Sequence, residues 1–463
     1  MVRFNSPQVV RHSSPQRNYR IGALVLLTVL VGFTVAVRAE APLNLNDAIK
    51  GALKSSEESQ LMVEKESKLQ AQKSEAFAGA LPTIQGYATA GRGSSPFDPS
   101  AIGGADSLPV FNPVLNRYTY GLQVDQALFS FGRIGQAYKV AGVALKSQAE
   151  SNRHSRHQLE LQALDAFYNA VNARARVEVI KASLKRQGQT VGFLQSNFQM
   201  GSGQRSSVLL ATSSLKSLEP QRIRSESDAD AARMSLNRLV GRPVQAEIEL
   251  DTTSIDASSV PSVDTTDAGI QKILERRPDL RAMELQKEAL SGIAREYRML
   301  YLPSLGFQGK AGILAYKLDK QLTDFDKNLE WSIGIGLQWN IFDGFSQSSK
   351  AHEYDSDARS MDLSTRQAWA YARIEIASAV REAAAADTAY EAAVQARNAA
   401  DEARQMLAQD FSAGKGQVTD LLSAEEGLRN AELGILSMRY QKVRANAALR
   451  VALGMDLIEE DAK

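Results

Sequence analysis

The chain has 463 residues, no cysteine and a formal net charge of +1 at pH 7. The lack of cysteine excludes disulfide bonds, thiol chemistry and attachment of a lipid to an N-terminal cysteine. A charge this close to zero gives no reason to expect nucleic acid as a partner.

The N-terminus has the pattern of a secretory signal. Arginines precede any acidic residue, and residues 21–37 then form a run of about seventeen mostly apolar residues. Short side chains stand at Val37 and Ala39, the two positions that a signal peptidase reads. We therefore expect residues 1–39 to be a cleaved signal peptide. An uncleaved membrane anchor is the alternative, because about seventeen apolar residues is the lower limit for spanning.

The rest of the chain consists of two copies of one unit. Residues 198–204 (FQMGSGQ) recur as 411–417 (FSAGKGQ), and residues 236–241 recur as 449–454, both at an offset of 213. We therefore predict a first structural repeat over residues 40–241, a connector over 242–267, a second repeat over 268–454 and a short tail over 455–463.

Each copy has the same order of elements. A helix runs into a Leu-Pro pair, and a strand, a loop, a second strand, a very long helix, a glycine-rich turn and a return helix follow. Leu81-Pro82 recurs as Leu302-Pro303 at an offset of 221, so the loop of the first copy is eight residues longer. Alternation of apolar and polar residues predicts strands at about residues 83–91, 118–129, 304–312 and 331–342.

The last strand has the clearest alternation. Serine, glycine, glutamine and asparagine occupy its even positions, and its apolar odd positions include Trp331, Ile333, Ile335, Leu337 and Trp339. In a membrane, lipid would cover the apolar face and water would fill the other side. We therefore expect these five residues to face lipid. Four strands cannot close a barrel, because about eight are needed, so the chain must oligomerise, and the polar inner face favours three chains over two.

The predicted helices are unusually long. Residues 345–413 contain neither glycine nor proline, which permits a helix of about seventy residues and roughly 100 Å. Residues 134–199 are its counterpart in the first copy. The second stretch is rich in alanine and has a coiled-coil-like, imperfect spacing of apolar residues, whereas the first is interrupted by four glycines.

The ordered set of landmarks resembles the TolC family of outer membrane efflux proteins over residues 45–454. The motifs that carry the resemblance are the two Leu-Pro strand entries, Arg277-Pro278-Asp279-Leu280, the strand exit Phe342-Asp343-Gly344 and the two glycine-rich turns. The resemblance implies a mainly α fold with a small β portion, in which a trimeric 12-stranded β-barrel continues into a periplasmic α-helical barrel. Residues 242–267 would lie in a mixed belt around that helical barrel, without the long C-terminal tail of some members.

The resemblance also implies a function. The chain would be the outer membrane channel of a tripartite efflux or type I secretion system, and a passive exit duct rather than an enzyme. The partners implied are two further copies in a homotrimer, a periplasmic adaptor (membrane fusion protein), an inner membrane pump and outer membrane lipid. No cofactor, metal or nucleic acid is implied, and the location would be the outer membrane with an extension into the periplasm.

In the family, the helical tips close the aperture and receive the adaptor. The corresponding tip residues here are Phe198, Gly201, Gly203, Phe411, Gly414 and Gly416, and we expect the four glycines to permit tight turns through positive φ. Asp420 matches an acidic position of the aperture, while Ser423 and Ser207 stand where other members can carry an acid. The alternative for Asp420 is a solvated residue at a helix start, where it complements the helix dipole.

Other chemistry is weakly indicated. His154 and His157 are one helical turn apart, but without a third ligand we expect them to be surface residues rather than a metal site. The glycine-rich segments lack the spacing of phosphate-binding loops. An exported coiled-coil scaffold without a pore is the alternative function, and it would explain the helices and the repeat but not the alternating strands.

Overall fold

A computed structural model describes residues 42–94, 114–251, 263–264, 266–317 and 324–458. All of them belong to one compact unit, Pro42–Lys463. The predicted signal peptide, the extra loop residues of the first copy and the middle of the predicted connector lie outside the described residues.

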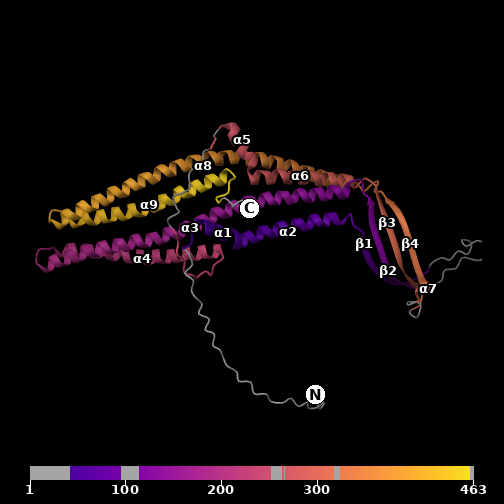
Figure 1. Cartoon of the computed structure of the whole chain (residues 1–463), viewed down its shortest axis with the longest axis horizontal. Helices are drawn as coiled ribbons and strands as arrows, with labels where there is room; N and C mark the ends of the chain where they lie inside the picture. Colours follow the sequence, from indigo (N-terminus) through magenta and orange to yellow (C-terminus); the bar gives the residue numbers. More distant parts are fainter. Residues whose placement is uncertain (1–41, 95–113, 252–262, 265, 318–323, 459–463) are drawn as a thin grey trace, which may run out of the picture. The chain divides into compact units, whose positions relative to one another are not determined.

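The described residues form long helices that meet a small sheet. Figure 1 shows the strands at one end of the long helices and, at the other end, the turns that join α3 to α4 and α8 to α9. The elements from the N-terminal part are α1 (Leu45–Ser55), α2 (Glu57–Ala78), β1 (Thr83–Ser94), β2 (Val114–Phe129), α3 (Arg133–Gln199) and α4 (Arg205–Val240). The elements that follow are α5 (Asp267–Arg276), α6 (Pro278–Met299), β3 (Ser304–Ala315), α7 (Phe325–Asn328), β4 (Leu329–Gln338), α8 (Ser346–Ser412) and α9 (Val418–Ala452).

The element boundaries recur between the two halves. Both ends of α6 lie 221 residues after those of α2, and the same holds for β3 and β1. Both ends of α8 lie 213 residues after those of α3, and each of these helices has 67 residues. Two consecutive residues with positive φ precede each long helix, Phe131 and Gly132 in one half and Gly344 and Phe345 in the other. Similar local sequences therefore build the same backbone twice.

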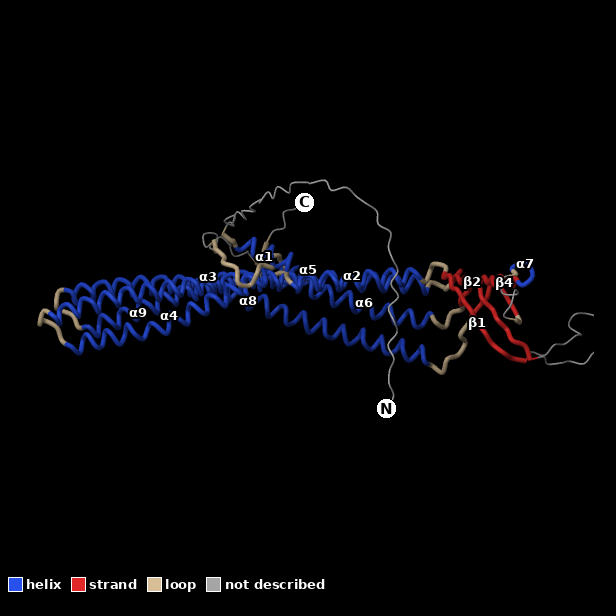
Figure 2. The backbone as a smooth tube through the Cα atoms, turned by 90° about the horizontal axis from the view of Figure 1, so that it is seen from below, coloured by secondary structure: helices blue, strands red, loops and turns tan. Residues whose placement is uncertain are grey.

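The four predicted strands form one antiparallel sheet in the order β1-β2-β3-β4. Strand β4 ends at Gln338, which pairs with Ser304, four residues before the predicted end at residue 342. The residue that precedes Ser304 is Pro303, and proline has no N–H to donate to the ladder. Trp339 therefore follows the strand, and its indole Nε1 donates to the Tyr301 carbonyl at 2.9 Å. Figure 2 shows short loops between the strands and the helices.

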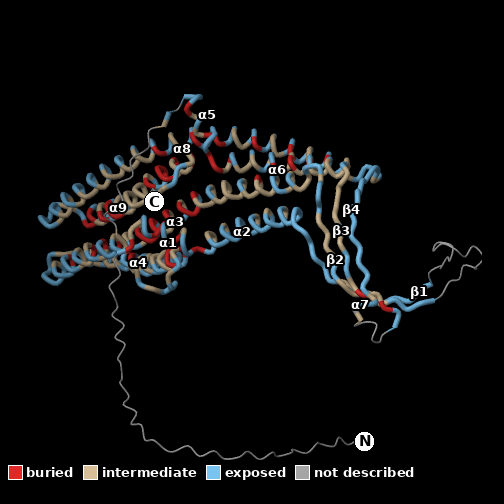
Figure 3. The backbone as a smooth tube through the Cα atoms, turned by 45° about the vertical axis from the view of Figure 1, so that its right-hand side comes forward, coloured by how far each residue is buried: buried red, intermediate tan, exposed pale blue. Residues whose placement is uncertain are grey.

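The helices pack side by side in one layer. Near the sheet the order of contacts is α2–α3–α6–α8, and beyond the middle it is α4–α3–α9–α8. The buried side chains concentrate where these two halves of the layer meet, around Phe167 and Tyr168, as Figure 3 shows by the red segments of α3 and α9. None of the described helices combines the length and the apolarity that crossing a membrane requires.

Candidate channel surfaces and helical tip

The sheet has one apolar and one polar face across all four strands. Directly paired residues share a face, and the register aligns rows of like character. One row holds Ile84, Val124, Gly309 and Ile333, and the next holds Gly86, Leu122, Ala311 and Trp331. The row between them on the opposite face holds Gln85, Gln123, Lys310 and Ser332. The alternation predicted for β4 is therefore a property of the whole sheet.

Much of the apolar face has no cover among the described residues, although Ile313 and Ala315 at the end of β3 are buried. The side chains of Trp331, Ile333, Ile335 and Leu337 are 66–67% exposed. The long helices pack along one another, and α7 is the helix that packs against β3. An exposed apolar surface of this extent requires an apolar environment or a partner.

Both edges of the sheet are also open among the described residues. Strands β1 and β4 each pair on one side only. The helices that continue these edge strands, α2 and α8, are likewise the outer helices of the layer. The sheet and the helical layer therefore end at the same two sides. On each side, backbone N–H and C=O groups of an edge strand lie beside an outer helix, without a partner strand among the described residues.

The predicted glycine-rich turns join α3 to α4 and α8 to α9. Gly201 and Gly414 have φ of 78° and 73°, as expected for tight turns. The expectation of positive φ is wrong for Gly203 and Gly416. A Cβ on Gly203 would lie 2.8 Å from the backbone nitrogen of Phe198, and one on Gly416 would lie 3.0 Å from that of Phe411. These two glycines are required for close approach of the backbone rather than for its conformation.

The two tips contact each other within the chain. Leu194 of α3, Ala211 of α4 and Val418 of α9 form a small buried cluster, against which Phe411 packs. The Phe411 ring also lies edge-on to Phe193, with 5.7 Å between centroids. Phe198 is 43% exposed, so the two repeat-related phenylalanines have different surroundings.

The predicted aperture residues lie near the start of the return helices. Asp420 and Ser423 are exposed on one face of α9, three residues apart, whereas Val418 and Leu421 on the opposite face are buried. Ser207 is half-buried in the first turn of α4. Asp420 and Ser423 are thus directed away from the packed tip of their own chain.

A buried ionic cluster above the tip was not predicted. The Glu425 side chain on α9 is fully buried, and its carboxylate accepts from Arg186 Nε of α3 at 3.0 Å and from Arg404 Nε of α8 at 2.7 Å. Arg186 also reaches Glu432, at 3.0 Å. Burial lowers the pKa of Arg186, but its hydrogen bonds to Glu432 and Glu425 outweigh that effect and leave the pKa raised. The cluster therefore joins one helical hairpin to the other.

A second buried cluster lies at the junction of α5 and α6. Arg277 donates to Asp279 at 2.8 Å, to Glu375 of α8 at 2.7 Å and to the Ala452 carbonyl of α9 at 3.0 Å. Burial raises the pKa of Asp279, but the hydrogen bonds and charge of Arg277 outweigh it, so the pKa lies below its usual value. Arg277, part of the motif that carried the resemblance, therefore ties three helices together.

The expectation that His157 is a surface residue is wrong. It is 1% exposed on α3, and its Nε2 lies 2.8 Å from Asp456 Oδ1 of the C-terminal segment. The neighbouring Glu160 is fully buried and accepts from the Leu457 N–H at 2.8 Å. Burial raises the pKa of the Glu160 carboxyl. His154 instead contacts Gln158 at 2.9 Å, so the two histidines do not share a site.

The sequence profile of the outer membrane efflux protein family matches residues 48–242 and 269–455, most of the chain. The chain belongs to the outer membrane efflux protein family. Like its family, this efflux protein resides in the outer membrane and extends into the periplasm.

Individual relatives are distant. This efflux protein is 24% identical to the alkaline protease secretion protein AprF of Pseudomonas aeruginosa over 346 residues, 73% of this chain and 70% of AprF. It is 23% identical to the outer membrane protein TolC of Vibrio cholerae over 328 residues, 68% of this chain and 72% of TolC. The open state of the MtrE outer membrane channel of Neisseria gonorrhoeae has the same fold, with a TM-score of 0.74, 21% identity and coverage of 90% and 91%.

Proposed function

We propose that this efflux protein is the outer membrane exit duct of a tripartite efflux or type I secretion system. An inner membrane pump and a periplasmic adaptor would deliver the substrate, and the duct itself would do no chemistry. The observation that carries the proposal is the sheet with one continuous apolar face, one polar face and two open edges. A lipid-facing barrel wall needs these properties, and a water-soluble scaffold does not.

The open edges support a homotrimer. Strand β4 of one copy would pair with β1 of the next, and α8 would pack against α2 of the next, because these are the unpartnered elements on the two sides. Three copies would give a 12-stranded barrel continued by an α-helical barrel. The polar rows that contain Gln123 and Lys310 would then line a water-filled lumen.

The tip is the proposed aperture and adaptor-docking region. Around a three-fold axis, the exposed Asp420 side chains of three copies would approach one another, with Ser423 and Ser207 nearby. The turns at Gly201, Gly203, Gly414 and Gly416, with the exposed Phe198 and half-buried Phe411, would meet the adaptor.

A single-channel recording tests the proposed function against the scaffold alternative. The purified full-length protein, added to a planar lipid bilayer, is expected to give discrete conductance steps. Mass measurement of the same preparation in detergent is expected to show a trimer. A protein that forms no conducting events under any applied voltage, or that stays monomeric in detergent, would contradict the duct.

Paired cysteines test which face of β4 meets lipid. The chain has no cysteine, so Ile335→Cys and Gly336→Cys each introduce a single thiol on opposite faces of one strand. We expect a membrane-impermeant maleimide to label position 336 at least about tenfold faster, because lipid excludes the reagent from position 335. Equal rates, or faster labelling at 335, would contradict the barrel.

Asp420→Ala tests the aperture. Three unit charges about 8 Å from an ion in water change its occupancy by up to about tenfold. We therefore expect a loss of cation selectivity of up to this size and weaker block by multivalent cations added from the periplasmic side. Trimers should remain intact, because the substitution removes only repulsion. Unchanged selectivity and block in a bilayer recording would show that Asp420 does not line the pore.

A further inference from the structure

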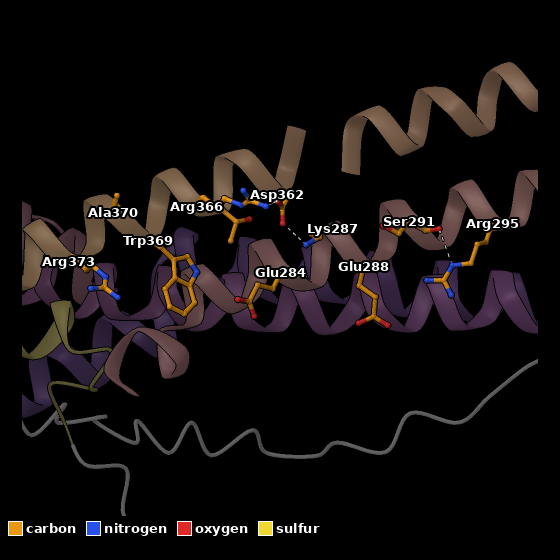
Figure 4. A pocket seen from close by; sticks show the side chains of 11 residues that line it. Glu284, Lys287, Glu288, Ser291, Arg295, Asp362, Arg366, Trp369, Ala370 and Arg373 are labelled. Carbon is orange, nitrogen blue, oxygen red and sulfur yellow. Dashed lines mark hydrogen bonds and ion pairs between the residues drawn. The ribbon is translucent and has the colours of Figure 1, made fainter. Parts of the chain in front are cut away.

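An open groove lies between α6 and α8 on the sheet side of α5. It has a cavity volume of about 780 Å³ and is lined by these two helices alone among the described residues. Trp369 points into it between Glu284 and Arg373, and Lys287 forms an ion pair with Asp362 above it at 2.5 Å, as Figure 4 shows. The half-buried indole of Trp369 packs on the core below.

The same groove exists in the first repeat, where two further segments of the chain also line it. It lies between α2 and α3 and has a volume of about 640 Å³. Its lining residues Val63, Asn152 and Arg156 are the repeat counterparts of Glu284, Thr365 and Trp369, at the offsets of 221 and 213 that relate these helices. Unlike the second groove, it is also lined by α1 and by Ile458 of the C-terminal segment.

One of these lining segments follows α9 and packs over α3. Asp456 contacts His157 at 2.8 Å, and the Leu457 N–H donates to Glu160 at 2.8 Å. The side chains of Leu457 and Ile458 pack against buried clusters of the first repeat. In the second repeat the counterparts of His157 and Glu160 are Ala370 and Arg373, and both are exposed.

The segment that follows α4 is the repeat counterpart of the segment that follows α9. Gly241 and Gly454 both end their helices with positive φ, of 77° and 73°. The next N–H donates back to the helix in both, Arg242 to the Asn237 carbonyl at 2.8 Å and Met455 to the Arg450 carbonyl at 2.9 Å. The chain therefore leaves both helices in the same way.

The segments after α4 and after α9 differ in how far their apolar side chains are buried. Leu457 is packed, but its counterpart Val244 is 46% exposed. Pro243 and Gln245 on either side are exposed too, and the Glu247 side chain is 89% exposed. A segment of the first repeat with an exposed valine thus corresponds to a groove of the second repeat that, among the described residues, α6 and α8 alone line.

The order of the helices determines where the two meet. Helix α9 lies between α8, its hairpin partner, and α3, which its C-terminal segment covers. Helix α4 lies against its hairpin partner α3, and the other side of α4 is the outer side of the layer. In the proposed trimer that side faces α8 of the neighbouring copy. The repeat relation therefore carries the segment after α4 onto the neighbour's groove.

We infer that the α6–α8 groove of each copy binds residues 242–247 of the adjacent copy. The inference rests on the proposed trimer. Pro243 would lie over Ala370 as Asp456 lies over His157, and Val244 would cover Trp369. Arg373 occupies the position of Glu160, which accepts from the backbone. Arg373 donates to Gln271 Oε1 at 3.0 Å in its own chain, and Glu247 lies 3.4 Å from Arg233 in its own chain. In the trimer, the Arg373 guanidinium would also pair with the neighbour's exposed Glu247 carboxylate. The interaction completes a belt of chain segments around the helical barrel.

Disulfide cross-linking in the full-length, otherwise cysteine-free protein tests this contact. Pro243→Cys with Ala370→Cys should give covalent dimers and trimers on a non-reducing gel after mild oxidation, because disulfides form only where Cα atoms come within about 7 Å. A second pair on exposed positions, Gln245→Cys with Arg366→Cys, is the counterpart of Ile458 with Arg153 and should behave alike. It keeps the test valid if the first pair impairs folding.

Two controls separate the possible outcomes. His157→Cys with Asp456→Cys should cross-link within one chain and leave a monomer on the gel. Pro243→Cys with Arg359→Cys places the second thiol on α8 about 16 Å farther along the helix and should not cross-link. If the protein is a trimer in detergent but neither test pair gives an intermolecular product, the inference is wrong and the proposed function is unaffected. Absence of trimers in the unmodified protein would instead overturn the proposed function.

Discussion

Glu425→Ala is expected to loosen the helical tip and to destabilise the helical hairpins by about 3–5 kcal/mol, the usual result of removing one partner of a buried ion pair. The substitution leaves the Arg186 and Arg404 guanidinium groups, 19% and 24% exposed, without the carboxylate that both contact. Arg186 retains Glu432, so Arg404 loses more. We expect an earlier loss of helical circular dichroism in urea and a larger leak conductance, because the cluster joins α3 to α8 and α9.

Glu426→Ala is the matched control for this variant. Glu426 is the next residue, its side chain is 64% exposed, and its ion pair with Arg429 lies within the same helix. The Arg429 side chain is 11% exposed, but the Glu426 carboxylate lies in solvent. Solvent screening is therefore expected to limit the contribution of the pair to at most about 1 kcal/mol, so the urea midpoint and the conductance should change little. Equal effects of the two substitutions would show that the buried cluster does not hold the hairpins together.

Arg277→Met is expected to be the most destabilising change at the junction of the repeats, by roughly 3 kcal/mol or more. It leaves Asp279, Glu375 and the Ala452 carbonyl without their shared donor, and these groups belong to three different helices. Urea unfolding followed by circular dichroism measures the loss. Arg276→Met is the control, because Arg276 is the preceding residue and is exposed.

The deficit of Arg277→Met is expected to shrink in acid. In the native protein the folded pKa of Asp279 lies below its ordinary value of 3.8. The stability that this ionised carboxylate contributes is therefore present above about pH 4 and is lost as pH falls through the folded pKa. In the variant, burial favours the protonated form of Asp279 and is opposed only by the smaller effects of His154 and the Leu280 N–H. Protonation in acid therefore removes part of the cost of burying this charge. A deficit that is constant from pH 7 to pH 3 would show that Arg277 acts through packing rather than through charge.

The amino-acid sequence by itself determined the repeated architecture. The four strands lie where alternation predicts them, and the two tip turns lie at the glycine-rich segments. Helix α8 lies in the segment without glycine and proline, and α3, which contains four glycines, lies where the repeat predicts the counterpart of α8. These features depend on local chemistry: side-chain period, backbone freedom and the missing N–H of proline act within a few residues. The sequence also contains a local signal for the burial of Glu425, because this residue lies in helical register with Val418, Leu421 and Leu428, which are buried.

The tertiary structure alone decided which distant residues meet. Nothing near His157 in the sequence indicates that a segment 299 residues later buries it, and nothing near Arg186 indicates a carboxylate 239 residues later. Gly203 and Gly416 likewise depend on the backbone that crosses them, which φ preferences do not reveal. Such contacts arise from the packing of long helices that are themselves locally specified. The periodicity of apolar residues in one helix predicts which face is buried, but only the arrangement of the neighbouring helices determines which residues that face contacts.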